Sequence, residues 1–519
     1  MRQMQGDPRM ARRLAGPRGA FGGIFAALLL LALAGAVHAD DQAAKVQPGQ
    51  KGGAGQNAPA AEQHRLPPDS TTKHTLALPG RTLSFSAVAG SIRLFDEKGE
   101  PQADVAYTSY QLDGGDEARP VTFFFNGGPG ASSAWLQLGD AGPWRLSITG
   151  EGAFASATPE LLPNAETWLD FTDLVFIDPV GTGYSRFVGS SDDVRRRIWS
   201  VDGDVETISL VIRRWLEKHD RLLSPKYVVG ESYGGIRGPK VLRNLQTKQG
   251  VGARGLILVS PVLDFRDWSG SSLLQYVARL PTMAAVAREA KGQVAHKDLV
   301  DVERYARGEF LTDLVKGQAD AEATDRMADK VAALTGIDAA VTRRLAGRFS
   351  VGEFRREFDR KHGKVTGRYD ASVTGFDPYP DSSYGQFGDP SGDPLMAPLT
   401  SAAVELTTRK LNWRPDGSYH LLNDSVSSAW NFGRGRDPAE SVSELRQSLA
   451  LDPKLKLLVG HGMFDLATPY FGTKIVLDQL PAYASPDRVK LVVYAGGHMF
   501  YSRDDARKAF RDEVQALMK

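Results

Sequence analysis

The chain has 519 residues, a formal net charge of +1 and no cysteine. This length allows one large α/β unit with insertions or two domains, and the charge balance provides no field that favours nucleic acid or an anionic membrane as a partner. The lack of cysteine excludes disulfides, thiol catalysis and cysteine-ligated zinc, and no HExxH motif occurs, so we expect no metal and no cofactor. The expected partner is a peptide or a small molecule, and the oligomeric state is left open.

The first 39 residues have the pattern of an export signal. Arginines between Arg2 and Arg18 precede an apolar stretch from Phe21 to Val37, and a cleavage site at Ala39 is followed by acidic, polar sequence. We expect a periplasmic or extracellular protein without stable membrane insertion; the alternative is an uncleaved anchor, because the stretch approaches the length of a membrane span. Residues 40–69, rich in Ala, Gly, Gln and Pro, are predicted to be a disordered linker.

Residues 70–265 are predicted to form the first part of an α/β core. Short alternating segments separated by Gly and Pro indicate antiparallel strands at 76–78, 83–88, 91–95 and 105–110. From residue 121 the pattern changes to short apolar runs typical of buried parallel strands, at 121–125, 174–177, 227–229 and 256–259. A helix is predicted over 202–219, where apolar residues share one face.

Residues 266–436 interrupt this rhythm with charged helical sequence and a stretch rich in Gly, Pro and Tyr, which we interpret as an inserted helical cap. Residues 437–519 resume it, with strands predicted at 455–459 and 489–494. Strands that alternate with helices predict a mostly parallel, doubly wound α/β sheet, preceded here by the antiparallel strands.

The motif Gly230-Glu231-Ser232-Tyr233-Gly234 directly follows a predicted strand. A GxSxG at a sharp strand-to-helix turn lifts the serine oxygen clear of the sheet, and the N-terminus of the next helix favours developing negative charge. The pattern indicates that Ser232 is a nucleophile.

A catalytic serine needs a base and an acid that orients the base, and in α/β-hydrolases they follow it in the order acid, then histidine. His498 lies directly after the last predicted strand and is the candidate base, while Asp465 follows the preceding strand and is the candidate acid. His461 precedes the candidate acid and is interpreted as a loop residue. Each assignment competes with an ordinary loop residue; strand position and chain order favour the catalytic role.

A glycine-rich turn, Asn126-Gly127-Gly128-Pro129-Gly130, ends another predicted strand. Its amides, with the amide of Tyr233, are candidates for an oxyanion hole. A phosphate-binding loop is disfavoured because the Lys and Ser or Thr of a P-loop are missing, and residues 180–184 lack the third glycine of a dinucleotide fingerprint.

Together these segments resemble the serine carboxypeptidase family, within the α/β-hydrolase fold and in an exported bacterial form, over about residues 126–501. The resemblance rests on NGGPGASS at 126–133, on 168–185 with DPVGTGYS at its end, on GESY at 230–233 and on GHM at 497–499.

The resemblance implies a role for each matching residue. Ser232, Asp465 and His498 correspond to the triad, the amides of Gly128 and Tyr233 to the oxyanion hole, and Met499 to the leaving-group pocket. The resemblance also implies a site that binds the terminal carboxylate of a peptide through one amide side chain, Asn126, and two acidic side chains, Glu231 and Asp140. At the position of Asp140 the family usually has Glu.

The two acids have a physical logic, because two close carboxylates do not readily ionise together and one then keeps a proton that it can donate to another carboxylate. We therefore expect KM for blocked dipeptides to rise from mildly acidic towards neutral pH. The sequence departs from the family at Ile236-Arg237-Gly238, where an aromatic run is usual, and in its lack of disulfides.

The sequence thus predicts a serine-type carboxypeptidase that acts on peptide substrates through an acyl-enzyme on Ser232. The alternatives are an esterase or acyltransferase with the same triad, since related folds exchange chemistry by changing pockets, and a non-catalytic binding protein.

Overall fold

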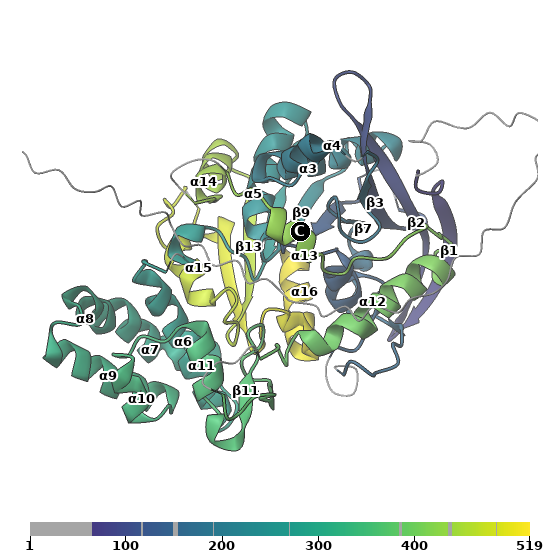
Figure 1. Cartoon of the computed structure of the whole chain (residues 1–519). Coiled ribbons are helices and arrows are strands. Elements are labelled where there is room, and N and C mark those ends of the chain that lie inside the picture. The colour runs from purple at the N-terminus through teal and green to yellow at the C-terminus, as the bar shows by residue number, and fades with distance from the viewer. Residues whose placement is uncertain are drawn as a thin grey trace, which may run out of the picture. The chain divides into compact units, whose positions relative to one another are not determined.

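A ten-stranded mixed sheet forms the centre of the structure, in the order β1-β2-β3-β7-β4-β9-β10-β13-β14, with β8 paired to β3. The computed structural model describes residues 65–115, 118–148, 154–189, 191–268, 270–382, 387–433, 438–483 and 485–519. The predicted signal segment, residues 1–39, and most of the predicted linker lie outside these ranges. The mostly parallel α/β sheet predicted from the sequence is confirmed (Figure 1).

The first strands are antiparallel, as the alternating pattern predicted. They are β1 (Ser70–Leu78), β2 (Arg81–Phe95) and β3 (Pro101–Leu112), and β3 also pairs antiparallel with β7 (Asp173–Ile177) and β8 (Arg186–Phe187). Residues 65–69, which the linker prediction placed outside the fold, pack against these strands: Leu66 is 3% exposed, and Asp69 accepts a hydrogen bond from Tyr107. Composition alone missed this contact because one apolar side chain among polar neighbours sets no periodicity.

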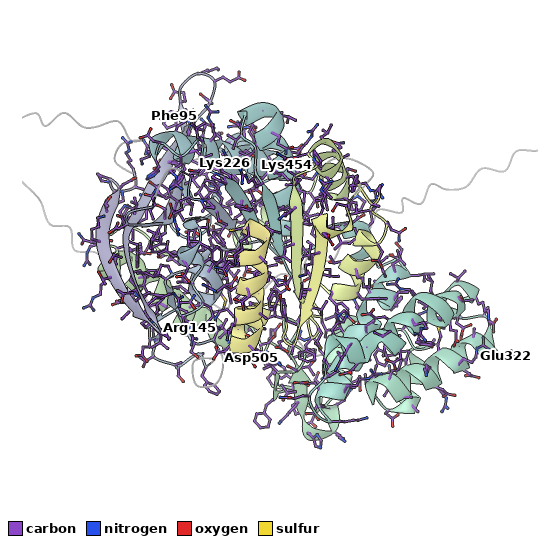
Figure 2. The ribbon with its side chains drawn as sticks, turned by 180° about the vertical axis from the view of Figure 1, so that it is seen from behind. Phe95, Arg145, Lys226, Glu322, Lys454 and Asp505 are labelled. Atoms are coloured by element: carbon purple, nitrogen blue, oxygen red, sulfur yellow. The ribbon has the colours of Figure 1, made fainter. Side chains whose placement is uncertain are left out.

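The remaining strands run parallel to β7. Neighbours pair in the order β7, β4 (Val121–Phe125), β9 (Lys226–Glu231), β10 (Gly255–Val259), β13 (Lys456–Gly462) and β14 (Val489–Tyr494). Figure 2 shows Lys226 and Lys454, at or just before the starts of β9 and β13, at the same end of the sheet. The carboxyl ends of these strands therefore meet at the opposite edge, where open α/β sheets bind their ligands.

Alternate residues of each buried strand serve two different cores. Phe124 belongs to the same core as Phe510 of α16 (Asp504–Met518) on one face, whereas Phe123 packs with Trp215 of α4 (Val201–Lys218) on the other. Helices α5 (Gly234–Asn244) and α14 (Val442–Leu451) lie on the face of α4. Burial on both faces explains why these strands appear in the sequence as continuous apolar runs.

Between β10 and β13 the chain forms a group of helices with its own core, which includes Met283, Phe310 and Phe354 (Figure 1). The group ends far from the sheet near Glu322 (Figure 2). Its elements are α6 (Leu274–Glu289), α7 (Val300–Tyr305), α8 (Leu311–Lys316), α9 (Ala321–Thr335), α10 (Ala339–Arg344), α11 (Val351–Glu357), β11 (Lys364–Thr366) and β12 (Thr374–Phe376). Helices α12 (Met396–Glu405) and α13 (Asp424–Ala429) follow in the chain but pack into the two cores of the sheet. The shorter elements elsewhere are α2 (Ala134–Leu136), β5 (Trp144–Arg145), β6 (Leu162–Pro163), α3 (Asp192–Ile198) and α15 (Tyr470–Leu477).

Candidate active site

Ser232 lies in the two-residue turn between β9 and α5, and its φ of 61° places it in the left-handed region. A residue other than glycine in that region costs about 1–2 kcal/mol and is held there by its surroundings. Here the amide of Ser232 donates to Val259 O at 3.0 Å, and Ser232 O accepts from the amide of Val262 at 3.0 Å. The neighbouring strand β10 and the loop that follows it therefore fix the turn.

Two glycines beside the serine are required by close packing. A Cβ on Gly230 would lie 2.5 Å from Gly234 O, and a Cβ on Gly235 would lie 2.3 Å from Val262 O. Gly234, the last glycine of the GxSxG motif, has room for a Cβ, since its nearest neighbour would be 3.5 Å away. The second essential glycine of this turn therefore lies one residue beyond the motif.

Asp465 and His498 meet in the loops after β13 and β14. His498 Nδ1 lies 2.7 Å from Asp465 Oδ2, and both side chains are buried. Asp465 Oδ1 also accepts the amides of Ala467 at 2.7 Å and Thr468 at 2.9 Å. Burial opposes the charged imidazolium, but the adjacent Asp465 outweighs it and raises the pKa of His498 above its usual value. With Nδ1 held in this way, Nε2 is the nitrogen left for proton transfer.

One cavity of about 290 Å³ contains most of the residues selected from the sequence. Ser232, His498, Asn126, Gly128 and Tyr233 all line it, together with Glu231 and Met499. The remaining lining residues are Gly127, Ala131, Trp135, Val262, Phe265, Arg368, Tyr369, Gly392, Asp393, Met396, Leu422, Ala467 and Thr468. Asp465 lies behind His498, as an orienting acid must.

The NGGPG turn packs directly against the serine turn. A Cβ on Gly127 would lie 2.4 Å from the amide nitrogen of Tyr233, and Gly128 has a φ of 98° that favours glycine. The glycines thus bring the backbone of residues 127–128 beside the amide that follows the nucleophile. This is the arrangement that an oxyanion hole needs.

Glu231 is held on the pocket wall by two donors. Asn126 Nδ2 donates to Glu231 Oε2 at 2.9 Å, and the hydroxyl of Tyr501 lies 3.0 Å from Oε2 and 3.2 Å from Oε1. Burial raises the pKa of Glu231 to about 7, although the positive charge of His498 and both hydrogen bonds act in the opposite direction. A protonated, hydrogen-bonded carboxyl of this kind can donate to a bound carboxylate in mild acid.

Asp140 departs from the expectation that it meets the substrate beside Glu231. It lies in the π-helix η1 (Gln137–Ala141), is fully buried, and is not among the described residues that line the cavity. Within the described part of the chain, neither of its carboxyl oxygens has a hydrogen-bond partner. Burial raises its pKa to about 8; Arg507 opposes this shift and Glu231 adds to it. The side chain ends one methylene earlier than the expected Glu, and the ring of Tyr501 lies against its helix.

His461 is also placed differently from its interpretation as a loop residue. It lies within β13, fully buried, with Nε2 2.9 Å from Thr473 Oγ1. Burial lowers its pKa to about 3, so the ring is neutral. The strand extends three residues past the predicted apolar run because Gly460 and Gly462 interrupt the apolar pattern without ending the pairing with β14.

Sequence reasoning missed several residues that the fold brings to the site. Tyr501 contacts Glu231, and the hydroxyl of Thr468 lies 2.6 Å from Asp465 Oδ2. Arg237, noted only as a departure, is fully buried, pairs with Asp204 at 2.6 Å and donates to Asn126 O beneath the glycine turn. No local pattern distinguishes such residues; the one available signal was a charged Arg among the glycine and apolar residues that directly follow the GxSxG.

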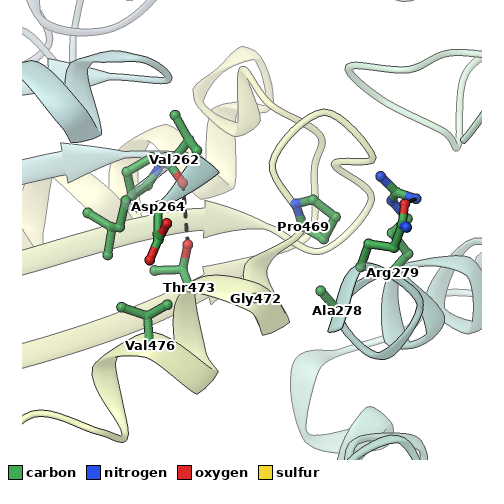
Figure 3. A pocket seen from close by; sticks show the side chains of 11 residues that line it. Val262, Asp264, Ala278, Arg279, Pro469, Gly472, Thr473 and Val476 are labelled. Carbon is green, nitrogen blue, oxygen red and sulfur yellow. Dashed lines mark hydrogen bonds between the residues drawn. The ribbon is translucent and has the colours of Figure 1, made fainter. Parts of the chain in front are cut away.

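A second cavity lies close by but is too small for a peptide. It has a volume of about 30 Å³ and lies between the loop after β10, helix α15 and helix α6. Figure 3 shows Thr473 at its wall, with the hydroxyl 3.3 Å from Pro261 O. This volume corresponds to about one or two water molecules, so the cavity lined by Ser232 and His498 is the candidate substrate site.

Neither a metal site nor a membrane span is found in the part of the chain that the structure describes. Among these residues no group of three or more His, Asp or Glu could hold a metal ion. No helix in the described ranges is long and apolar enough to cross a membrane.

Comparison with known proteins gives the following matches. Residues 79–267 match the serine carboxypeptidase family, Peptidase_S10. Serine carboxypeptidase-like 13 of Arabidopsis thaliana is 29% identical over 185 residues, which are 35% of this chain and 41% of that protein. Serine carboxypeptidase-like 5 of the same plant is 26% identical over 244 residues, 45% of this chain and 51% of that protein. The chain thus spans about half or less of the length of these relatives.

One solved structure has the same fold over most of the chain. The prohormone-processing carboxypeptidase KEX1(DELTA)P from Saccharomyces cerevisiae superposes with a TM-score of 0.53 at 16% identity, covering 89% of this chain and 96% of that one. This likeness shows the fold. The matched sequence segment contains both the NGGPG turn and the serine turn. The sequence is thus similar to the serine carboxypeptidase family over residues 79–267, and the fold of the chain is of the α/β-hydrolase type.

Proposed function

We propose that this chain is a serine-type carboxypeptidase, which releases single residues from the C-terminus of peptides. The observation that carries the proposal is that one cavity combines Ser232 and His498 with a buried carboxyl and amide, Glu231 and Asn126. Any serine hydrolase needs the first pair. The second pair suits an enzyme that binds a free carboxylate next to the bond it cleaves.

The proposed mechanism follows from these positions. Ser232 Oγ attacks the carbonyl carbon of the last peptide bond while His498 Nε2 takes the hydroxyl proton, and the Gly128 and Tyr233 amides stabilise the oxyanion. The C–N bond then breaks, and His498 returns the proton to the leaving amine. Water, deprotonated by the same imidazole, hydrolyses the acyl-enzyme and regenerates Ser232. Asp465 fixes the imidazole and stabilises its charged form.

The terminal carboxylate is proposed to bind at Glu231 and Asn126, with Met499 beside the leaving residue. Because the pKa of Glu231 is about 7, its neutral form donates a hydrogen bond to the carboxylate in mild acid, whereas the ionised form repels it. KM for free-acid peptides is therefore expected to rise as the pH passes from about 6 to 8.

A pair of matched peptides tests the proposal. A peptide with a free C-terminal carboxylate and its amidated twin are incubated with the wild type and with Ser232→Ala, and the products are followed by mass spectrometry. Stepwise shortening of the free acid alone, absent in Ser232→Ala, is the expected result. Internal cleavage contradicts the proposal, and equal turnover of the amide favours an esterase or acyltransferase. A wild type that does not react with a fluorophosphonate at Ser232 indicates a binding protein.

We also propose that residues 266–436 form a cap that shapes access to the pocket. Arg368, Tyr369, Asp393, Met396 and Leu422 come from this segment and line the cavity. Substitutions here are expected to change selectivity between peptides while leaving fluorophosphonate labelling of Ser232 intact, which activity-based labelling and peptide profiling measure together.

The amino-terminal pattern supports the further proposal that the chain is an exported bacterial protein whose signal is cleaved after Ala39. Expression of the full chain in a bacterial host, followed by N-terminal sequencing of the exported fraction, tests it. A mature protein that begins at Asp40 is expected; retention of the full chain in the membrane fraction indicates an anchor.

A further inference from the structure

Tyr501 contacts both Glu231 and the helix η1 that contains Asp140, which are far apart in the sequence. Its hydroxyl lies 3.0 Å from Glu231 Oε2, at the end of β9. Its ring lies against π-helix η1, since a Cβ built on Gly139 would be only 2.6 Å from Tyr501 Cε2. Gly139 immediately precedes Asp140, so the same side chain contacts Glu231 and the backbone beside Asp140.

The hydrogen bonds around Glu231 favour one of its two oxygens as the position of the proton. Oε2 accepts both Asn126 Nδ2, at 2.9 Å, and the Tyr501 hydroxyl. Oε1 lies 3.2 Å from the Tyr501 hydroxyl, and this is the longer of the two contacts that the hydroxyl makes with Glu231. A proton on Glu231 is therefore favoured on Oε1, which leaves Oε1 as the donor and Oε2 as the acceptor.

Tyr501 acts only as a donor in this arrangement. Burial, with the nearby charges of Glu231 and Asp140, raises the pKa of Tyr501 well above its usual value, so the phenol keeps its proton. Asp140 offers Glu231 no comparable contact, because neither of its oxygens has a hydrogen-bond partner within the described residues. The nearest polar support of Glu231 from this side of the pocket is thus a hydroxyl.

We propose that Tyr501, in place of Asp140, is the residue that positions Glu231 to receive the terminal carboxylate of a peptide substrate. The inference rests on the proposed carboxypeptidase activity and deepens it by naming a positioning residue. Tyr501 is not among the described residues that line the cavity, so it acts through Glu231 and does not touch the substrate.

The charged groups around Glu231 set the direction of its pH response. His498 lowers its pKa and Asp465 raises it, while Asp140 is coupled to it and is itself faced by Arg507, which pairs with Glu166 and Asp504. The hydrogen bond from Tyr501 lowers the pKa of Glu231. Removing that hydroxyl therefore keeps Glu231 protonated to higher pH and moves the rise in KM upward.

The experiment compares Tyr501→Phe with Tyr494→Phe. Tyr494 is a matched control because its hydroxyl is also buried but has no hydrogen-bond partner within the described residues. Steady-state kinetics from pH 5 to 8.5 use an N-blocked dipeptide with a free carboxylate and the corresponding dipeptide methyl ester. For Tyr501→Phe, KM for the free acid is expected to rise about tenfold in mild acid, the loss of one hydrogen bond to a carboxyl group. Its pH midpoint is expected to move upward, with little change in kcat or in ester turnover.

The outcomes separate this inference from the proposed function. Wild type that hydrolyses the ester but not the free acid overturns the carboxypeptidase proposal. Wild type active on the free acid, with Tyr501→Phe showing an unchanged KM and pH midpoint, overturns the role of Tyr501 alone, as does an equal rise of KM for acid and ester. If Tyr501→Phe does not fold, Gly139→Ala keeps the hydroxyl but displaces the ring, and the same selective rise in KM is expected.

Discussion

Asp465 and Asp140 are both fully buried aspartates near the pocket, but their surroundings are opposite. Asp465 is contacted by the amides of Ala467 and Thr468, the hydroxyl of Thr468 and the imidazole of His498. Asp140 receives no hydrogen bond within the described residues, and its pKa rises to about 8. Burial raises the pKa of Asp140 because no local donor stabilises its charged form, so the donors around a buried carboxyl matter as much as its burial.

The largest expected effect comes from neutralising the well-supported acid. Asp465→Asn removes the charge that stabilises the imidazolium and can hold His498 in the wrong tautomer, so kcat is expected to fall by about 10⁴. Stopped-flow or steady-state kinetics with an activated ester measure this fall in kcat. Asp487→Asn, a substitution of an exposed aspartate, is the control. A loss of less than tenfold would mean that Asp465 is not the orienting acid.

The variant Asp140→Asn tests whether the carboxyl of Asp140, which has no hydrogen-bond partner within the described residues, makes the unfolding free energy depend on pH. The pKa of Asp140 is 3.8 in its usual state and about 8 in the fold. Its contribution to folding is therefore complete below about pH 4 and is lost as the pH rises towards 8. Between pH 4 and pH 8, the unfolding free energy of wild type is expected to fall. The unfolding free energy of Asp140→Asn is expected to fall by a few kcal/mol less.

Denaturant titrations at several pH values measure this difference, and Glu97→Gln, at an exposed turn, is the control. If wild type and Asp140→Asn show parallel dependence of unfolding free energy on pH, Asp140 is ionised in the folded protein. It would then have a partner that stabilises its charge, and the contrast with Asp465 would not hold.

The smallest expected effect comes from removing the Thr468 hydroxyl, which lies beside Asp465. The Thr468 hydroxyl lies 2.6 Å from Asp465 Oδ2 and 2.9 Å from Ser260 O, and its single proton serves one of them. Thr468→Val is expected to lower kcat by about threefold to tenfold with KM nearly unchanged, the usual net cost of one hydrogen bond. Thr408→Val, whose hydroxyl bonds within its own helix, should leave kinetics as they are. A large rise in KM instead would place Thr468 in substrate binding.

The features predicted correctly from sequence are those with local signatures. The apolar runs at 121–125, 227–229 and 489–494 are strands because burial on both faces imposes a continuous pattern. The serine turn, the glycine turn and the histidine after the last strand each occupy the end of such a run, so the topology of a parallel sheet brings them to one edge.

The features that were missed depend on contacts between distant segments. Leu66 packs on the sheet, Tyr501 reaches Glu231 across 270 positions and Arg237 reaches Asn126 across 111, and no periodicity records these pairs. Asp140 has the right place in the chain, but it is fully buried and is not among the described residues that line the cavity.

By itself the sequence determined the order of strands and turns, the absence of cysteine chemistry and the identity of the residues at the carboxyl edge of the sheet, because each of these is encoded within a few consecutive residues. Only the tertiary structure decided which buried acids have donors and that the hydroxyl of Tyr501 contacts Glu231. Those properties depend on distances of a few ångströms between segments that lie tens to hundreds of residues apart.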